Sequence, residues 1–156
     1  MAEMEETGGL LDGILAVTHP ELYRVSQELI RNILAEGTRA SEVMRLWPTS
    51  FNSVQFIINR LSLLHQDKNT RAGWVDLLLT LGTYGQKALL ELHNLGVSVP
   101  YDSGTIAVLC SRVIRHGVAR VEGDRLCYVL YMVENVHTHF GMSVPGFAHI
   151  NEVCAL

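Results

Sequence analysis

The sequence has few cysteines and no segment typical of secretion or of membrane insertion. Its three cysteines, Cys110, Cys127 and Cys154, are an odd number at wide spacings, which excludes a disulfide framework. Residues 1–9 are acidic rather than basic, so they are not typical of a secretory signal. No stretch reaches the roughly 18 apolar residues that span a bilayer. We therefore expect a protein of a reducing compartment without an integral membrane anchor.

Basic residues are also scarce. The chain has 12 Lys and Arg against 16 Asp and Glu, a formal charge of −4. A nucleic-acid-binding face needs clustered Lys and Arg, and the sequence has no such run. Hydrophobic residues make up 48% of the 156 positions, which is enough apolar material for one sizeable core. The sequence predicts one folded domain with no nucleic-acid partner.

Motifs that carry catalysis or bind metals are missing as well. The seven histidines are scattered, and neither the helical i, i+4 pair nor the Cys-x-x-Cys spacing of zinc sites occurs. A phosphate-binding loop, a nucleophile elbow and a dinucleotide fingerprint are likewise missing. We therefore expect no catalytic residue, no metal and no cofactor, and hence no enzyme.

Apolar residues instead recur with helical periodicity. Pro20 and Glu21 follow the potential cap Thr18, which is typical of a helix start. The apolar pattern then continues to Gly37, which is placed to end the helix. The pattern predicts further helices over residues 40–47, 51–64, 105–121 and 126–137.

The most apolar segment, residues 71–94, predicts a central helix surrounded by others. Gly73, Gly82 and Gly85 within it either allow close packing or have a functional role. The sequence therefore predicts an all-α fold, a helical bundle in which amphipathic helices wrap the central one. We place a flexible N-terminus at residues 1–9, a single helical domain at 10–140 and an irregular tail at 141–156.

Three stretches resemble the Bcl family of apoptosis regulators, and one of them, Ile106-Ala107 with the residues that follow, is similar to a later core helix of that family. Residues 21–30, ELYRVSQELI, are similar to that family's first helix. Residues 71–82 resemble its first Bcl-homology motif, with matching glycines at Gly73 and Gly82. The Arg of that motif falls on Trp74, and Leu81 replaces its usual Phe. The short link after Gly37 and the missing tail anchor further resemble a divergent, virus-encoded member, which implies a Bcl-like helical bundle.

This resemblance implies an inhibitor of apoptosis. The protein would sequester the helical death motif of Bim-like pro-apoptotic proteins in an apolar groove, with a narrow partner range. The partner-binding residues that the resemblance implies are Val43, Met44, Phe51, Leu61, Leu64, Arg71, Gly73, Trp74, Leu77, Leu78 and Leu81. Arg71 is either a surface arginine or the group that grips an Asp of the ligand. Trp74 contacts either the ligand or a second copy in a homodimer. The implied location is the host cytoplasm, including the mitochondrial periphery.

Three other hypotheses stay open. A self-associating helical structural or assembly protein would form oligomers and bind no peptide. A pro-apoptotic effector would keep the fold but would need a membrane-inserting segment, which is not evident. An enzyme would need a catalytic constellation, and the sequence reveals none.

Overall fold

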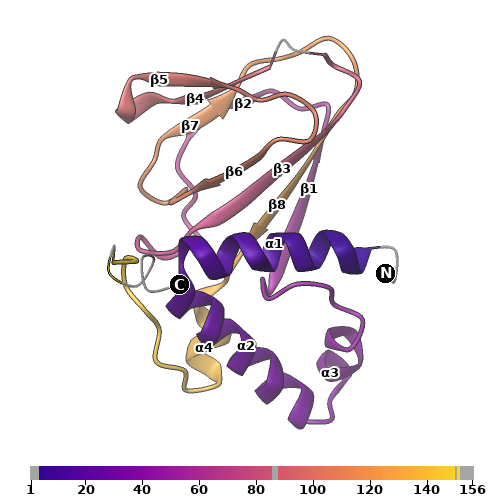
Figure 1. The fold of residues 1–156 in the computed structure, drawn as a ribbon, viewed down its shortest axis with the longest axis vertical. Coiled ribbons are helices and arrows are strands. Elements are labelled where there is room, and N and C mark those ends of the chain that lie inside the picture. The colour runs from indigo at the N-terminus through magenta and orange to yellow at the C-terminus, as the bar shows by residue number, and fades with distance from the viewer. Residues whose placement is uncertain (1–3, 86–87, 150, 152–156) are drawn as a thin grey trace. The chain divides into compact units, whose positions relative to one another are not determined.

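The computed structural model describes residues 4–85, 88–149 and 151, which form both helices and sheets (Figure 1). The chain divides into two compact units. A helical unit comprises the residues up to Asn52 and those from Val133 onward, and a β unit comprises Ser53–Met132. The predicted all-α, Bcl-like bundle is wrong, because the β unit consists of two antiparallel four-stranded sheets.

The helical unit contains α1 (Glu5–Thr18), α2 (Pro20–Ala35), α3 (Arg39–Met44) and α4 (Glu134–His139). The helices predicted from Thr18 to Gly37 and over residues 40–47 are confirmed as α2 and α3. The α1 helix begins at Glu5, inside the stretch predicted to be flexible, and the boundaries at residues 9 and 140 stay predictions. The buried apolar side chains of α1 and α2 are Leu11, Leu15, Leu22, Val25, Leu29 and Ile33. Among the described residues, the helices are too short or too polar to cross a membrane.

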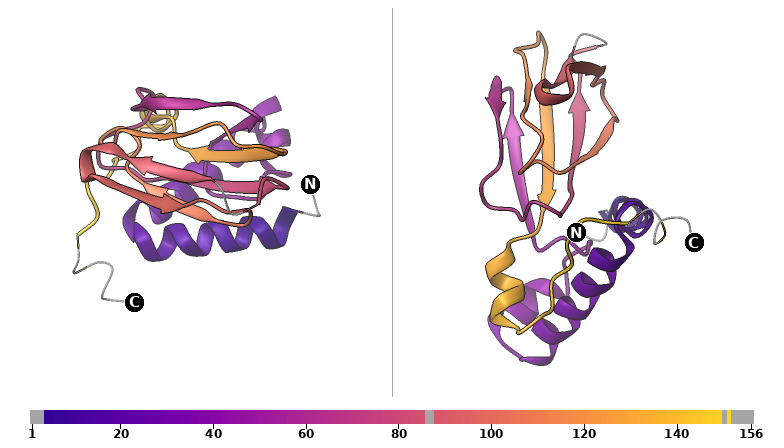
Figure 2. Two further views of the ribbon diagram at one scale, coloured as in Figure 1. Left: turned by 90° about the horizontal axis from the view of Figure 1, so that it is seen from above. Right: turned by 90° about the vertical axis from the view of Figure 1, so that its left-hand side faces the viewer.

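In the β unit, one sheet has the strand order β1-β8-β3-β6 and the other the order β2-β7-β4-β5. The first sheet contains β1 (Ser53–Ile58), β3 (Asp76–Gly82), β6 (Ile106–Leu109) and β8 (Arg125–Tyr131). The second contains β2 (Ser62–His65), β4 (Leu89–Leu92), β5 (Val97–Pro100) and β7 (His116–Val118), with the 3-10 turn η2 (His93–Leu95) after β4. The sheets pack face to face (Figure 2) around one core, which consists of Leu78, Tyr84, Ala88, Leu90, Tyr101, Leu109, Val118, Cys127 and Val129.

The predicted central helix over residues 71–94 is wrong. The segment instead contains β3 and β4, while residues 86–87 lie outside the described residues. A continuous apolar run is compatible with a buried strand as well as with a buried helix. Here β3 lies between β8 and β6, and the consecutive side chains of Leu77, Leu78 and Leu79 are all buried. Gly82 ends the strand with a φ of +148°, a backbone conformation that side chains disfavour.

The helices predicted over residues 51–64, 105–121 and 126–137 are wrong as well. The first range contains β1 and β2, and the second contains β6 and β7. In the third, β8 occupies the first half and α4 begins only at Glu134. Along β8, Arg125, Cys127 and Val129 are buried while the residues between them are partly exposed, which is the period of two expected of a strand.

Candidate functional site

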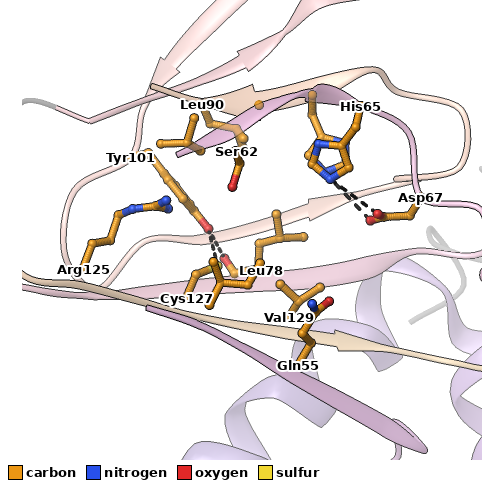
Figure 3. A pocket seen from close by; sticks show the side chains of 14 residues that line it. Gln55, Ser62, His65, Asp67, Leu78, Leu90, Tyr101, Arg125, Cys127 and Val129 are labelled. Atoms are coloured by element: carbon orange, nitrogen blue, oxygen red, sulfur yellow. Dashed lines mark hydrogen bonds and ion pairs between the residues drawn. The ribbon is translucent and has the colours of Figure 1, made fainter. Parts of the chain in front are cut away.

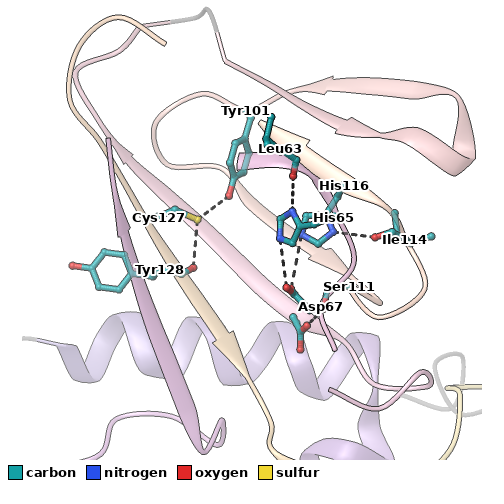
Figure 4. Close-up of polar contacts among 10 residues, drawn as sticks. Leu63, His65, Asp67, Tyr101, Ser111, Ile114, His116, Cys127 and Tyr128 are labelled. Carbon is teal, nitrogen blue, oxygen red and sulfur yellow. Dashed lines mark hydrogen bonds and ion pairs between the residues drawn. The ribbon is translucent and has the colours of Figure 1, made fainter. Parts of the chain in front are cut away.

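Three side chains with metal-binding atoms converge at the β2–β7 strand pair. His65 ends β2, Asp67 follows two residues later, and His116 begins β7. The two strands pair antiparallel, with His65 opposite His116. Gly117 allows the strands to approach, because a Cβ there would lie 2.8 Å from the Ser62 carbonyl oxygen. Among the described residues, one ligand atom from each of His65, Asp67 and His116 lies within 4.8 Å of the other two (Figure 4).

Backbone carbonyl groups fix the direction in which both imidazoles point. His65 Nδ1 lies 2.7 Å from the Leu63 carbonyl oxygen, and His116 Nδ1 lies 2.9 Å from the Ile114 carbonyl oxygen. Because a carbonyl oxygen only accepts, each Nδ1 carries the proton, which leaves the Nε2 lone pair available. The two Nε2 atoms lie 3.4 Å and 3.9 Å from the carboxylate oxygens of Asp67. Hydrogen bonds of this kind orient histidines that bind metals.

The electrostatic setting also suits a cation. His116 is 3% exposed, and its burial lowers the pKa of the imidazole. The neighbouring His65 lowers that pKa further, whereas the hydrogen bond to Ile114 and the charge of Asp67 raise it. A neutral imidazole is the form that binds a metal. Two imidazole nitrogens and one carboxylate oxygen are the donor set of non-haem iron oxygenases, so the residues present fit Fe(II).

The same three side chains line a pocket that lies between the two sheets (Figure 3). Its apolar wall is formed by residues of both sheets, namely Ile57, Leu78, Leu90, Val118 and Val129. Its polar groups include Arg125 and Tyr101, and the guanidinium of Arg125 points into the pocket toward Tyr101. An apolar pocket with a few convergent polar groups is typical of a small-molecule site.

Arg125 is the cation of this pocket and is only 3% exposed. One of its terminal nitrogens donates to the Arg60 carbonyl oxygen at 2.6 Å, which anchors the side chain. Burial raises the pKa of the Tyr101 phenol and of the Cys127 thiol, so both stay neutral at physiological pH. A buried guanidinium is stabilised most by a carboxylate or phosphate that pairs with it bidentately. The pocket therefore suits an anionic ligand.

The residues predicted to line a groove do not come together in this site. Leu78 alone of them lies among the described lining residues of the pocket. Phe51, Gly73, Trp74 and Leu77 are buried. Met44, Leu64 and Arg71 are partly exposed. Val43, Leu61 and Leu81 are exposed.

Sequence reasoning missed His65, Asp67, His116 and Arg125. The histidines seemed scattered because their proximity depends on the β2–β7 pairing, and the sequence was interpreted as helical. The available signal was the spacing His65-x-Asp67, which is not a helical metal pair but is compatible with the end of a strand. A single basic residue within the apolar pattern of β8, Arg125, was a second signal.

Residues 1–134 match a family model, Tet_JBP, described as the oxygenase domain of the 2OGFeDO superfamily. No curated protein shows a significant match. The family match overturns the resemblance to a virus-encoded Bcl-family regulator and, with it, the predicted inhibition of apoptosis. The expectation that the chain is not an enzyme is also wrong, and the alternative of a self-associating structural protein has no support. Together with the His65, Asp67 and His116 site, the match establishes that this chain belongs to the Tet_JBP family of oxygenase domains.

Proposed function

We propose that this chain is a dioxygenase that depends on 2-oxoglutarate and Fe(II). The proposal rests above all on one observation, the convergence of His65, Asp67 and His116 on a pocket that also contains a buried arginine. In this account the three residues hold the iron, and Arg125 pairs with a carboxylate of 2-oxoglutarate. The family description names both the oxygenase activity and the superfamily.

The iron, when bound, supplies the reaction with dioxygen, in which 2-oxoglutarate becomes succinate and carbon dioxide while one oxygen atom enters the substrate. The protein contributes the binding and orientation of the reactants. The carbonyl groups of Leu63 and Ile114 keep both Nε2 atoms directed at Asp67. The carboxylate of Asp67 offsets part of the charge of a divalent ion, which favours binding between the two imidazoles.

The wall of the pocket strengthens the pairing proposed for Arg125. Leu90, Val118 and Val129 line the pocket with apolar surface that excludes water. Charge pairs are stronger where the local dielectric constant is low. Tyr101 holds its ring in place through its hydroxyl group, which donates to the Leu78 carbonyl oxygen at 3.2 Å. The Tyr101 ring is therefore held at the wall of the pocket beside Arg125.

The proposal is tested by turnover of 2-oxoglutarate. Purified protein, Fe(II), dioxygen and 2-oxoglutarate are incubated with a fractionated cell extract as the source of substrate, and succinate is quantified by mass spectrometry. We expect succinate well above the amount formed by H116A, which retains the pocket but lacks one metal ligand. Equal amounts from the two proteins would refute the proposal.

The proposed activity does not test three other expectations from the sequence. The cytoplasmic location, the homodimer and the lack of a nucleic-acid partner stay predictions.

A further inference from the structure

The loop between β6 and β7 leads into His116 and contacts the segment that carries Asp67. It is compact, because the Cys110 carbonyl oxygen accepts hydrogen bonds from the backbone N–H groups of Val113 and Ile114, both at 2.8 Å. Its Ser111 carbonyl oxygen accepts from the Asp67 N–H at 3.1 Å. Its Ile114 carbonyl oxygen holds Nδ1 of His116. A shift of this loop would therefore move both Asp67 and His116.

A buried carboxyl group of β3, the strand that pairs with β6, holds this loop. Asp76 begins β3, is 1% exposed, and accepts a hydrogen bond from the Ser111 hydroxyl group through Oδ2. The pairing of β3 with β6 explains the contact, because Asp76 lies opposite Leu109, two residues before Ser111. Asp76 Oδ1 has no hydrogen-bond partner among the described residues.

Burial of the Asp76 carboxyl group lowers the stability of the folded state. A buried polar atom without a partner destabilises the folded state, and burial raises the pKa of Asp76 to about 7. An apolar residue would serve β3 better if packing were its only task. The carboxyl group instead accepts the hydrogen bond from the Ser111 hydroxyl group.

We propose that Asp76 is a positioning residue of the metal site, which acts through Ser111 to fix the backbone that presents Asp67. This inference rests on the proposed function, since it takes His65, Asp67 and His116 as metal ligands. The chain of contacts is continuous. The Asp76 carboxyl group accepts from the Ser111 hydroxyl group, and the Ser111 carbonyl group accepts from the Asp67 N–H.

The test measures the affinity of the metal itself. Co(II) is titrated into metal-free wild type, D76A, S111A and the double variant, with affinity from calorimetry and ligand geometry from the visible absorption of Co(II). Partners that orient metal ligands change affinity by about 10- to 100-fold when they are removed. We expect a weakening of this size in each single variant. The double variant should be no weaker than the weaker single variant, because both substitutions break one chain of contacts.

Two further variants separate positioning from general destabilisation. D76N keeps an oxygen that accepts from Ser111 and should bind Co(II) within about threefold of wild type. S41A removes another buried serine hydroxyl group, which donates to the Ile33 carbonyl oxygen in the helical unit, and should leave Co(II) affinity unchanged.

Each outcome decides between the hypotheses. If D76A and S111A are folded by circular dichroism and bind Co(II) within twofold of wild type, the inference is wrong. If D76A does not fold, S111A decides, since it removes only one hydroxyl group. If wild type itself binds no Co(II), the proposed function fails, and the inference fails with it.

Discussion

The imidazole rings of His65 and His116 lie with their centroids 4.5 Å apart and their planes tilted by 47°, on paired strands of one sheet. Two neighbouring imidazoles would repel each other if both were protonated, and burial of His116 already disfavours its charge. Both rings are oriented by backbone carbonyl groups, and both Nε2 atoms are directed at Asp67. The two Nε2 atoms and the Asp67 carboxylate are therefore arranged to bind one cation.

Replacement of His116 should strongly weaken metal binding. H116A removes one of three donors, and we expect its affinity for Fe(II) or Co(II) to fall by more than about 100-fold, since even the loss of a group that orients a ligand can reach that size. The measurement is anaerobic calorimetry. His93, an exposed residue of η2, provides the control, and H93A should bind metal as wild type does. If H116A and H93A lost the same metal affinity, the metal would not bind at His116.

Arg125 should determine the affinity for 2-oxoglutarate but not for metal. R125M keeps an unbranched side chain and removes the charge. A hydrogen bond to a charged group contributes about 1.5–3 kcal/mol, so the Kd for 2-oxoglutarate should rise about 10- to 150-fold. R125K should restore little of this, because an ammonium group does not pair bidentately. Arg120 is exposed, and R120M is the control. A normal Kd in R125M would exclude the proposed pairing.

Asp76 should make the stability of the metal-free protein depend on pH. Burial, with a smaller contribution from the charge of Asp67, raises its pKa from 3.8 to about 7, although the hydrogen bond from Ser111 opposes the change. Between these values the folded state binds a proton that the unfolded state has lost. The free energy of unfolding therefore falls as pH rises from about 4 to about 7, by about 4 kcal/mol in total.

The variant D76N lacks this proton, so its stability relative to wild type should increase across that range and level off above about pH 7. Urea unfolding at pH 5 and pH 8, with a chelator present, measures the difference. Exposed Glu91 supplies the control E91Q for the loss of a surface charge. A difference between D76N and wild type that does not change with pH would show that Asp76 is ionised in the folded state throughout.

Adjacent glycines of α1 should respond to alanine in opposite directions. A Cβ at Gly8 would collide with the Pro48 carbonyl oxygen, so G8A should destabilise the protein by about 1–3 kcal/mol. Gly9 has nothing within 4 Å of such a Cβ, so G9A should stabilise the helix by up to about 1 kcal/mol. Thermal unfolding of both variants tests the packing of α1 on the segment that contains Pro48. Equal effects would contradict it.

The sequence predicted α2 correctly because several signals agree there. Pro20 stands in the first turn, and the buried Leu22, Val25, Leu29 and Ile33 recur at helical spacing. The β unit gave no such agreement. In β3, Leu77, Leu78 and Leu79 form an unbroken apolar run that does not distinguish a helix from a strand enclosed on both faces.

The candidate site could not be predicted without the strands. His65 and His116 meet only because β2 pairs with β7, and Arg125 faces the pocket only because β8 alternates with a period of two. A helical interpretation separates all of these residues. Because the sequence was interpreted with the helical period instead of the period of two of a strand, neither the fold nor the metal site was predicted.

The central claim is that one site binds both iron and 2-oxoglutarate. Its residues are His65, Asp67, His116 and Arg125. The most direct measurement is anaerobic calorimetry of 2-oxoglutarate with the wild-type protein, with and without Fe(II), and again with H116A. If both ligands share the site, iron should tighten the binding of 2-oxoglutarate at least tenfold in wild type, an energy of about 1.4 kcal/mol, and should have no effect in H116A. An affinity that is unchanged by iron in wild type would contradict the account.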